Sequence, residues 1–190
     1  MDAQTPAAAA GREAERVVVL ACPADAHTQR HAHAAQGAFA DKFGGGGAYV
    51  VATPTTTGGA SVASEDVATA DGQEHALSLV LQRLQSLQLQ RSAFGAPSAS
   101  LLSRAKVLAA VQPCIYRLKG GGATRSYACY WVGAVDLDSG RTATGASVST
   151  ELHSESQASS PGLATRSAFA LDEDAAASLG HAWKSLVSSL

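Results

Sequence analysis

Residues 107–152 constrain the fold of this chain more than any other stretch of its sequence. Two runs rich in aromatic and β-branched residues, 107–118 and 127–135, flank three consecutive glycines. An Asp-Ser-Gly turn at 138–140 then leads into a third run, 142–152. Extended runs separated by short glycine-containing turns are typical of β-hairpins. The sequence therefore predicts three antiparallel strands joined as a meander.

Two of these strands carry signals about their place in the sheet. Pro113 removes one hydrogen bond from the ladder of the first strand, which favours a sheet edge or a bulge at that position. In 142–152 neither alternate set of residues is strongly apolar, so this strand is expected to be half exposed. A fourth strand is predicted at 165–171, after a loop rich in Ser, Pro and Gly at 157–162.

Two amphipathic helices are predicted on either side of the meander. The first begins near Asp71, with Glu74 three residues later in the pattern of a capping box, and stops before Gly95. Its apolar stripe is Leu77, Val80, Leu81, Leu84 and Leu87, with Ser78, Gln82, Arg83 and Gln85 opposite. The second occupies 172–190 and starts with acidic residues, as the positive helix end favours. Its apolar face is Ala176, Leu179, Trp183, Leu186 and Leu190, which we expect to pack on the sheet.

The N-terminal half contributes shorter signals. Residues 17–20 and 49–51 predict two strands, and 28–43 predicts a helix that the glycines after residue 43 end. The expected organisation is a disordered tail at 1–15 and one domain at 16–190, with a flexible loop at 53–72. The predicted fold class is α+β, an antiparallel β-sheet meander packed against two or three helices.

Composition excludes several classes of protein. The net charge is −2, and Lys and Arg are scattered along the sequence, so the basic cluster expected of a nucleic-acid-binding protein is missing. The apolar run 17–22 is too short to span a bilayer, and the acids before it disfavour a signal or import sequence. Cys22, Cys114 and Cys129 are an odd number, which predicts thiols in a reducing compartment, with Cys114 and Cys129 able to face each other on neighbouring strands. We expect a cytoplasmic protein without nucleic-acid or membrane partners.

No residue cluster predicts an enzyme. His27 and His31 stand one helical turn apart, near His33 and Cys22, but no further ligand completes a zinc site, and we expect solvated histidines on a helix face. The glycine runs match no phosphate-binding motif, and no G-x-S-x-G motif occurs. Asp136 and Asp138 fit a solvated hairpin turn better than a catalytic carboxylate pair. The prediction is no catalytic residue, no cofactor and no metal.

The meander resembles the sheet of Tctex-type dynein light chains. The resemblance rests on Cys114-Ile115-Tyr116-Arg117-Leu118-Lys119-Gly120-Gly121-Gly122, Cys129-Tyr130-Trp131 and Asp138-Ser139-Gly140. Ser167-Ala168-Phe169-Ala170-Leu171 is similar to the closing strand of that family, and the helix over 74–91 matches the helix before its sheet. The resemblance covers residues 72–171. The loops here are longer, and the strand at 17–20 and the C-terminal helix lie outside the pattern.

This resemblance implies a non-catalytic homodimer that binds an extended segment of the dynein intermediate chain by β-strand addition. It also implies association with microtubules or cilia. The exposed composition of 141–150 makes that strand the expected contact. The predicted partner-binding residues are Arg141, Thr142, Thr144, Ala146, Val148 and Thr150.

Two other functions remain open on the sequence. A subunit or assembly factor of another multiprotein complex, such as a transcription-complex subunit or an assembly chaperone, would share the same outline of helices on an antiparallel sheet. A small metal-dependent enzyme using His27, His31 and Cys22 is the third possibility.

Overall fold

The computed structural model describes residues 16–23, 28–43, 48–55, 70–92, 99–120, 123–152 and 173–190. In chain order the strands and helices are β1 (Arg16–Pro23), α1 (Thr28–Phe43), β2 (Ala48–Thr55), β3 (Ala70–Asp71), α2 (Gln73–Ser92), α3 (Ala99–Arg104), β4 (Ala105–Gly120), β5 (Ala123–Asp136), β6 (Thr142–Ala146), β7 (Thr150–Leu152) and α5 (Glu173–Ser189). The predicted tail at 1–15, the strand at 165–171 and most of the loop at 53–72 lie outside the described residues.

The described strands form one mixed seven-stranded sheet in the order β2-β1-β4-β5-β6, with β3 beside β4 and β7 beside β5. The predicted antiparallel meander is confirmed, because β5 runs antiparallel to β4, β6 and β7. Parallel pairing of β1 with both β2 and β4 was not predicted. For β1 and β2 it arises because α1 returns the chain to the starting end of the sheet before β2 begins, as a crossover helix does.

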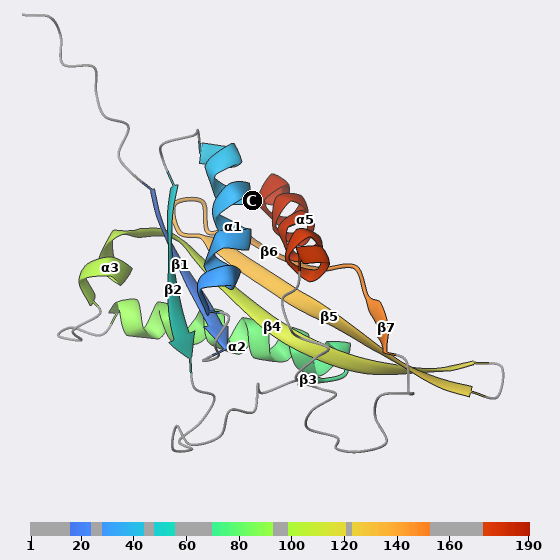
Figure 1. Cartoon of the computed structure of the whole chain (residues 1–190). Coiled ribbons are helices and arrows are strands. Elements are labelled where there is room, and N and C mark those ends of the chain that lie inside the picture. The colour runs from blue at the N-terminus through green and yellow to red at the C-terminus, as the bar shows by residue number, and fades with distance from the viewer. Residues whose placement is uncertain are drawn as a thin grey trace, which may run out of the picture.

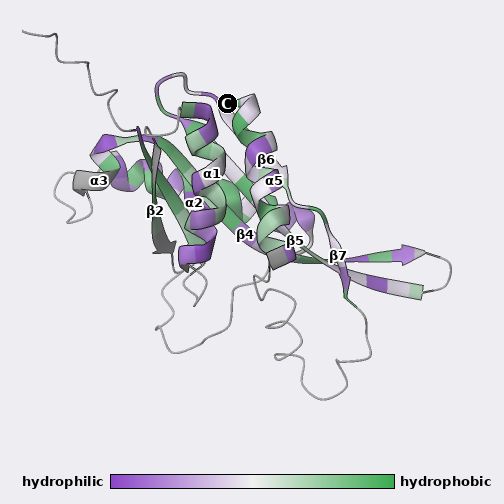
Figure 2. Ribbon diagram, turned by 45° about the horizontal axis from the view of Figure 1, so that its top comes forward, coloured by the Kyte–Doolittle hydropathy of each residue, from purple (hydrophilic) through white to green (hydrophobic). Residues whose placement is uncertain are grey.

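Helices cover both faces of this sheet, so that the core has two layers (Figure 1). On one face α1 and α5 pack side by side, and Phe39 of α1 lies 5.8 Å from the Trp183 ring. On the other face α2 packs through Val80, Leu84 and Leu87. Figure 2 shows the apolar residues gathered between helices and sheet. The predicted α+β class with helices packed on the sheet is therefore confirmed.

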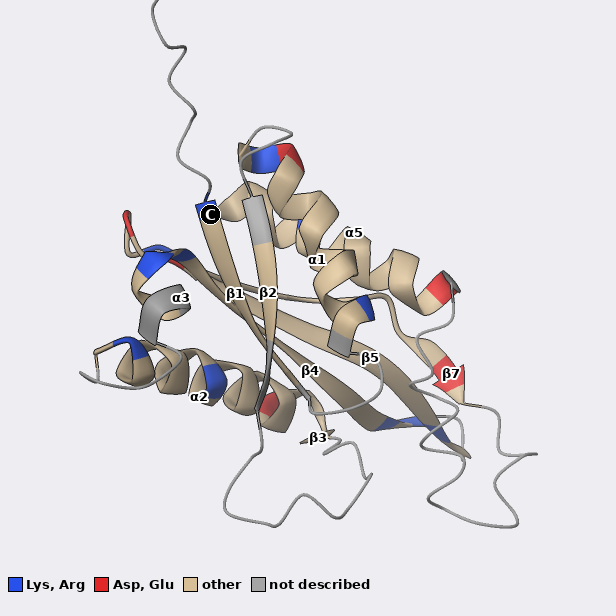
Figure 3. Cartoon of the chain, turned by 60° about the vertical axis from the view of Figure 1, so that its left-hand side comes forward, with Lys and Arg blue, Asp and Glu red and all other residues tan. Residues whose placement is uncertain are grey.

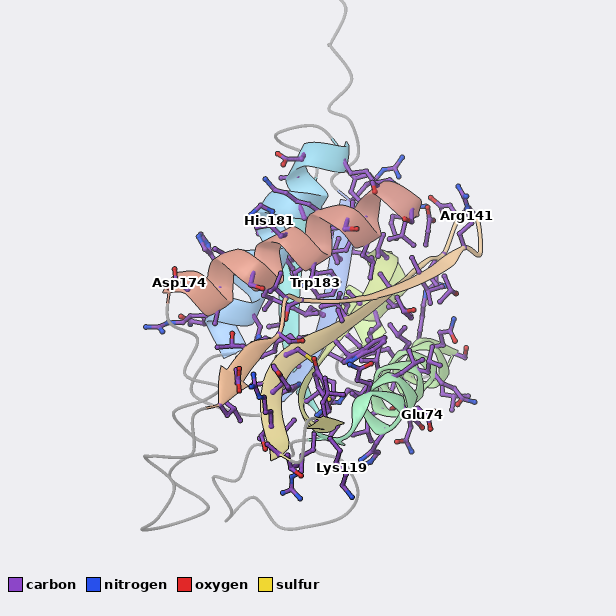
Figure 4. The ribbon with its side chains drawn as sticks, turned by 90° about the vertical axis from the view of Figure 1, so that its right-hand side faces the viewer. Glu74, Lys119, Arg141, Asp174, His181 and Trp183 are labelled. Carbon is purple, nitrogen blue, oxygen red and sulfur yellow. The ribbon has the colours of Figure 1, made fainter. Side chains whose placement is uncertain are left out.

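The C-terminal helix docks as predicted. Trp183 is fully buried and points from α5 toward the sheet (Figure 4). Leu179, Leu186 and Leu190 are buried with it. Truncation of a buried tryptophan typically costs about 3–5 kcal/mol, so this helix is an integral part of the core.

The predicted apolar stripe of α2 is partly wrong. Its buried residues are Ala76, Val80, Arg83, Leu84 and Leu87. Leu81, assigned to the buried stripe, is 44% exposed, whereas Arg83, assigned to the polar side, is 4% exposed. The start of the helix differs as well. Gly72 has φ of 93° and its carbonyl accepts the Ala76 amide, so Gly72 rather than Asp71 occupies the N-cap.

The third predicted strand is interrupted between β6 and β7. Ser147 causes the break, because its hydroxyl accepts the Tyr130 amide at 2.9 Å and donates to the Val148 carbonyl at 3.1 Å. This side chain takes over bonds that a continuing backbone ladder would make. Residues 147–149, called the link from here on, therefore leave the strand conformation before β7 resumes it.

Two glycine substitutions test the packing of the two layers. A Cβ at Gly133 would lie 2.5 Å from Val80 Cγ1, whereas a Cβ at Gly180 would meet nothing closer than the Ala34 carbonyl oxygen at 3.9 Å. We expect Gly133→Ala to lower the free energy of unfolding by about 1–3 kcal/mol, since valine in a helix has little rotamer freedom. Gly180→Ala should raise it by about 0.5–1 kcal/mol. Urea denaturation of both variants measures the difference, and equal effects would contradict the packing described.

Candidate functional site

The predicted partner-binding strand lies at one edge of the sheet. Strand β6 ends the strand order, and the register pairs Ala143 with Ala134. Two backbone bonds show which groups face β5: Asp136 donates to the Arg141 carbonyl at 2.9 Å, and Ser147 donates to the Tyr130 carbonyl at 2.8 Å.

Because hydrogen-bonding direction alternates along an antiparallel strand, the odd-numbered residues of β6 face β5. The backbone N–H and C=O groups of Thr142, Thr144 and Ala146 consequently point away from the sheet. These are three of the predicted partner-binding residues, and their amides form the outer edge.

All six predicted residues have side chains exposed at this edge. They are Arg141, Thr142, Thr144, Ala146, Val148 and Thr150. Val148 is 76% exposed, which is unusual for a large apolar side chain. Arg141 stands at the turn before β6 (Figure 4), and its guanidinium contacts the Leu190 carbonyl oxygen of the C-terminus at 3.4 Å. The structure thus brings the six residues together along one border, which we call the open edge.

The opposite edge of the sheet, formed by β2, is protected against further pairing. The Val50 amide donates to the Gln36 side-chain oxygen of α1 at 2.9 Å. Pro54, also in β2, has no amide hydrogen to offer. Proline and covering helices are devices by which proteins prevent edge-to-edge association. Two outward backbone positions of β2 are therefore unavailable for pairing, whereas no such protection is seen at β6 among the described residues.

A rigid turn positions β6. The Asp136 carboxylate accepts the amides of Asp138 and Ser139 at 2.9 and 3.3 Å, and Gly140 adopts φ of 71°. Asp138 forms an ion pair with Lys106 at 2.9 Å. Burial raises the pKa of Asp136, but the amide hydrogen bonds outweigh burial and leave the pKa below the usual value. Both aspartate side chains thus help to hold the turn in place.

A second polar region lies where β1 ends. Strand β4 pairs with β1 as far as Ala110 and with β3 from Cys114 onward. The Gly72 amide donates to the Ile115 carbonyl, so residues 111, 113 and 115 direct their backbone groups to this flank. Pro113 therefore lies on an interior strand, but at a position where one flank has no neighbouring strand among the described residues, so the predicted edge is present there locally. It is tolerated because its missing amide hydrogen faces the gap between β1 and β3.

Arg83 fills this gap from α2. Its guanidinium donates to the Val111 carbonyl oxygen at 2.5 Å. Burial lowers the pKa of Arg83 to about 10, partly offset by the nearby Cys22 thiol. Among the described residues no carboxylate pairs with it, and its Nε has no hydrogen-bond partner. Sequence reasoning missed this residue, because arginine between glutamines on a helix is usually solvated.

The histidine prediction needs correction. His31 is 1% exposed and packs edge-on against Tyr130 with ring centroids 5.8 Å apart, so it is not a solvated residue. His33 is exposed, and His27 lies outside the described residues. Within the described part of the chain no three His, Cys, Asp or Glu side chains come together as metal ligands.

The β4–β5 hairpin extends beyond the helices as an arm (Figure 1), and its end carries three cations (Figure 3). Arg117, Lys119 and Arg125 are exposed there, and Arg125 pairs with Glu151 of β7 at 3.6 Å. Leu118 between them is 54% exposed. The arm borders the open edge through β7, so an extended partner at that edge would run toward positive charge.

Comparison with known proteins identifies a fold and no family. No family model matches the chain. No curated protein matches it either. Among solved structures, the crystal structure of protein VC0702 from Vibrio cholerae is similar, with a TM-score of 0.59 and 11% sequence identity. The match covers 92% of this chain and 94% of that one. At this identity the likeness concerns the fold alone, and the resemblance to Tctex-type light chains stays a prediction.

None of the helices among the described residues is both long enough and apolar enough to cross a bilayer.

The pKa of Asp136 leads to a pH-dependent prediction. A carboxylate whose folded-state pKa is depressed contributes stability above its unfolded pKa and loses it as pH falls through the folded pKa. We expect Asp136→Asn to lower the free energy of unfolding at pH 7, because the asparagine accepts the same amides without the charge. The difference from the wild type should shrink as pH falls below the usual aspartate pKa of about 3.9 and vanish once pH is below the lower pKa of Asp136 in the folded protein. Denaturation curves across this range measure it, and a constant difference would refute the electrostatic origin.

Proposed function

We propose that the protein is a non-catalytic interaction subunit that binds an extended segment of a protein partner along the open edge. The observation that carries this proposal is the contrast between the two outer strands. Gln36 and Pro54 protect β2, whereas β6 exposes outward backbone groups at Thr142, Thr144 and Ala146. A bound strand would satisfy these groups in the manner of β-augmentation.

The composition of the open edge supports this mode of binding. Thr, Ala and Gly are small, so a partner backbone can approach closely, and β6 has neither the lysine nor the proline that commonly blocks an edge. Each backbone hydrogen bond contributes about 0.5–1.5 kcal/mol net. Val148 adds an exposed apolar contact next to β6.

Partner identity follows from the sequence resemblance rather than from the fold. If the protein acts as a Tctex-type light chain, the segment belongs to the dynein intermediate chain, a second copy of the protein completes a homodimer, and the assembly associates with microtubules or cilia. A subunit of another complex would use the same edge for a different segment. In both cases the ligand is an extended peptide segment. The identity of the partner protein distinguishes the two cases.

A second candidate function is binding of a small anionic ligand at the end of β1. Its support is the buried guanidinium of Arg83, which lacks a carboxylate partner among the described residues. Burying an unpaired charge is costly, so an anion would offset the penalty. The position also fits, because β2 and β4 flank β1 on opposite sides, and open sheets bind ligands at the carboxyl ends of strands where the order reverses.

Substitution of Thr144 tests the open edge. Thr144→Pro removes an outward-facing amide hydrogen, whereas Thr144→Val keeps it in a side chain of similar shape. We expect affinity purification from native cells to recover the partner with both the wild type and the valine variant. The proline variant should recover at least about tenfold less partner, because it loses one or two strand-addition hydrogen bonds. Circular dichroism of both variants checks that each is folded.

Hydrogen exchange of the purified complex locates the contact. Partner binding should slow exchange at the amides of Thr142, Thr144 and Ala146. Protection confined to other elements, with equal recovery on both variants, would refute the proposal. Recovery of dynein chains would support the light-chain identity, while recovery of a different complex with the same protection would replace that identity and retain the binding mode.

The anionic-ligand candidate has a separate measurement. Thermal unfolding in inorganic pyrophosphate, compared with sodium chloride of equal ionic strength, should show a stabilising shift for the wild type. The shift should be lost in Arg83→Met, whatever the lower starting stability of that variant. Arg91→Met, on the exposed end of the same helix, is the matched control. Equal shifts in all three proteins would reject a specific site.

A further inference from the structure

Cys114 and Cys129 oppose each other directly in the middle of the sheet. They are partners in the β4–β5 ladder, both are buried, and neither forms a disulfide. The backbone N–H and C=O groups of Tyr130 face Ser147, so those of the preceding residue, Cys129, face β4. Cys114 and Cys129 are therefore a hydrogen-bonded pair of the antiparallel ladder. The α-carbons of such a pair are about 5.5 Å apart, within the range of about 4.4–6.8 Å that a disulfide spans. Their β-carbons, about 4.5–5.5 Å apart on opposed strands, must approach by up to about 1 Å to reach the roughly 3.5–4.5 Å of a disulfide.

The two thiols are also in chemical contact. A hydrogen bond from Cys114 lowers the pKa of the Cys129 thiol, burial opposes this, and a hydrogen bond from the Ser149 hydroxyl lowers the pKa further. The net effect is a pKa below the usual value. Since the thiolate is the reactive form, Cys129 is suited to attack first and Cys114 to resolve.

The pair is linked to the open edge by hydrogen bonds. The Tyr116 hydroxyl donates to Ser149 Oγ at 2.8 Å, and Ser149 in turn bonds the Cys129 sulfur. Ser149 belongs to the link between β6 and β7. The link is therefore held to the sheet partly by a hydrogen bond to the Cys129 sulfur, which disulfide formation would disturb.

We propose that Cys114 and Cys129 form a reversible dithiol–disulfide modification site that reacts with low-molecular-weight disulfides and loosens the link when oxidised. Cys129 thiolate attacks one sulfur of the small disulfide, forming a mixed disulfide and releasing one small thiol. Cys114, after losing its proton, attacks the Cys129 sulfur and expels the second small thiol. The protein loses two protons and two electrons, and the small disulfide gains both.

Oxidation would alter partner binding as well as thiol state. A disulfide sulfur has no hydrogen to donate and accepts hydrogen bonds only weakly, so Ser149 would lose part of its anchor. Val148 and Thr150, on either side of Ser149, belong to the open edge. This consequence rests on the proposed function, whereas disulfide formation itself does not.

The test equilibrates the full chain in glutathione redox buffers, both as native protein and during refolding, which removes any barrier of access. We expect the intact mass to fall by two hydrogens, alkylation to label one cysteine, and peptide mapping to join Cys114 to Cys129. Cys22, buried against the other face of the sheet, should remain the labelled thiol. Cys22→Ser should form the same disulfide, and Cys114→Ser should form none.

Hydrogen exchange then tests the coupling. The Val148 to Thr150 amides should exchange about tenfold faster in the oxidised protein, the factor expected for loss of one hydrogen bond. Three labelled thiols under both conditions, or a disulfide that includes Cys22, would overturn the modification site. A Cys114–Cys129 disulfide with unchanged exchange would overturn the coupling alone, and failure of partner binding in the reduced protein would count against the proposed function instead.

Discussion

The pairing of β4 is the constraint on which the rest of the structure depends. This strand pairs with β5 from Val107 to Gly120 and, on its other flank, with β1 and then β3. Its alternating side chains enter both layers of the core, with Val107, Ala109 and Val111 toward α1 and α5 and Leu108 and Ala110 toward α2. A slip of one residue would exchange these faces. The register of β4 therefore sets the environment of every helix that packs on the sheet.

The interval that β4 leaves unpaired explains two residues that look misplaced. Between Ala110 and Cys114 one flank has no neighbouring strand among the described residues. Pro113 needs no partner there, and the Val111 carbonyl obtains one from Arg83. The proline inside the sheet and the arginine inside the core are thus both accommodated by the same unpaired stretch of β4. The arginine remains without a counter-charge among the described groups, which is why this gap is a candidate ligand site.

The open edge and the cysteine pair also belong together. Ser147 ends β6, and the link that follows runs along β5 beside Cys129 before β7 begins. The link is therefore held by a few side-chain hydrogen bonds, whereas a continuous strand would have a full backbone ladder at this position. Such segments open at low free-energy cost, and binding surfaces are commonly drawn from them. Oxidation of the two thiols would therefore act close to the surface that is proposed to bind a partner.

Sequence by itself determined the local elements: the helix over 28–43, the meander, the opposition of Cys114 and Cys129, and the apolar face of α5. These follow from periodicity, turn residues and hairpin register, which involve neighbouring residues. Only the tertiary structure decided the parallel pairing of β1, the burial of Arg83 and His31, and which outer strand is protected. Those features depend on the spatial order of strands and on contacts between residues far apart in the chain, such as Gln36 with Val50 and Arg83 with Val111. The polar composition of β6 predicted that this strand could bind a partner. Only the tertiary structure made β6 an edge strand, because whether a strand lies at an edge depends on where all the other strands of the sheet lie.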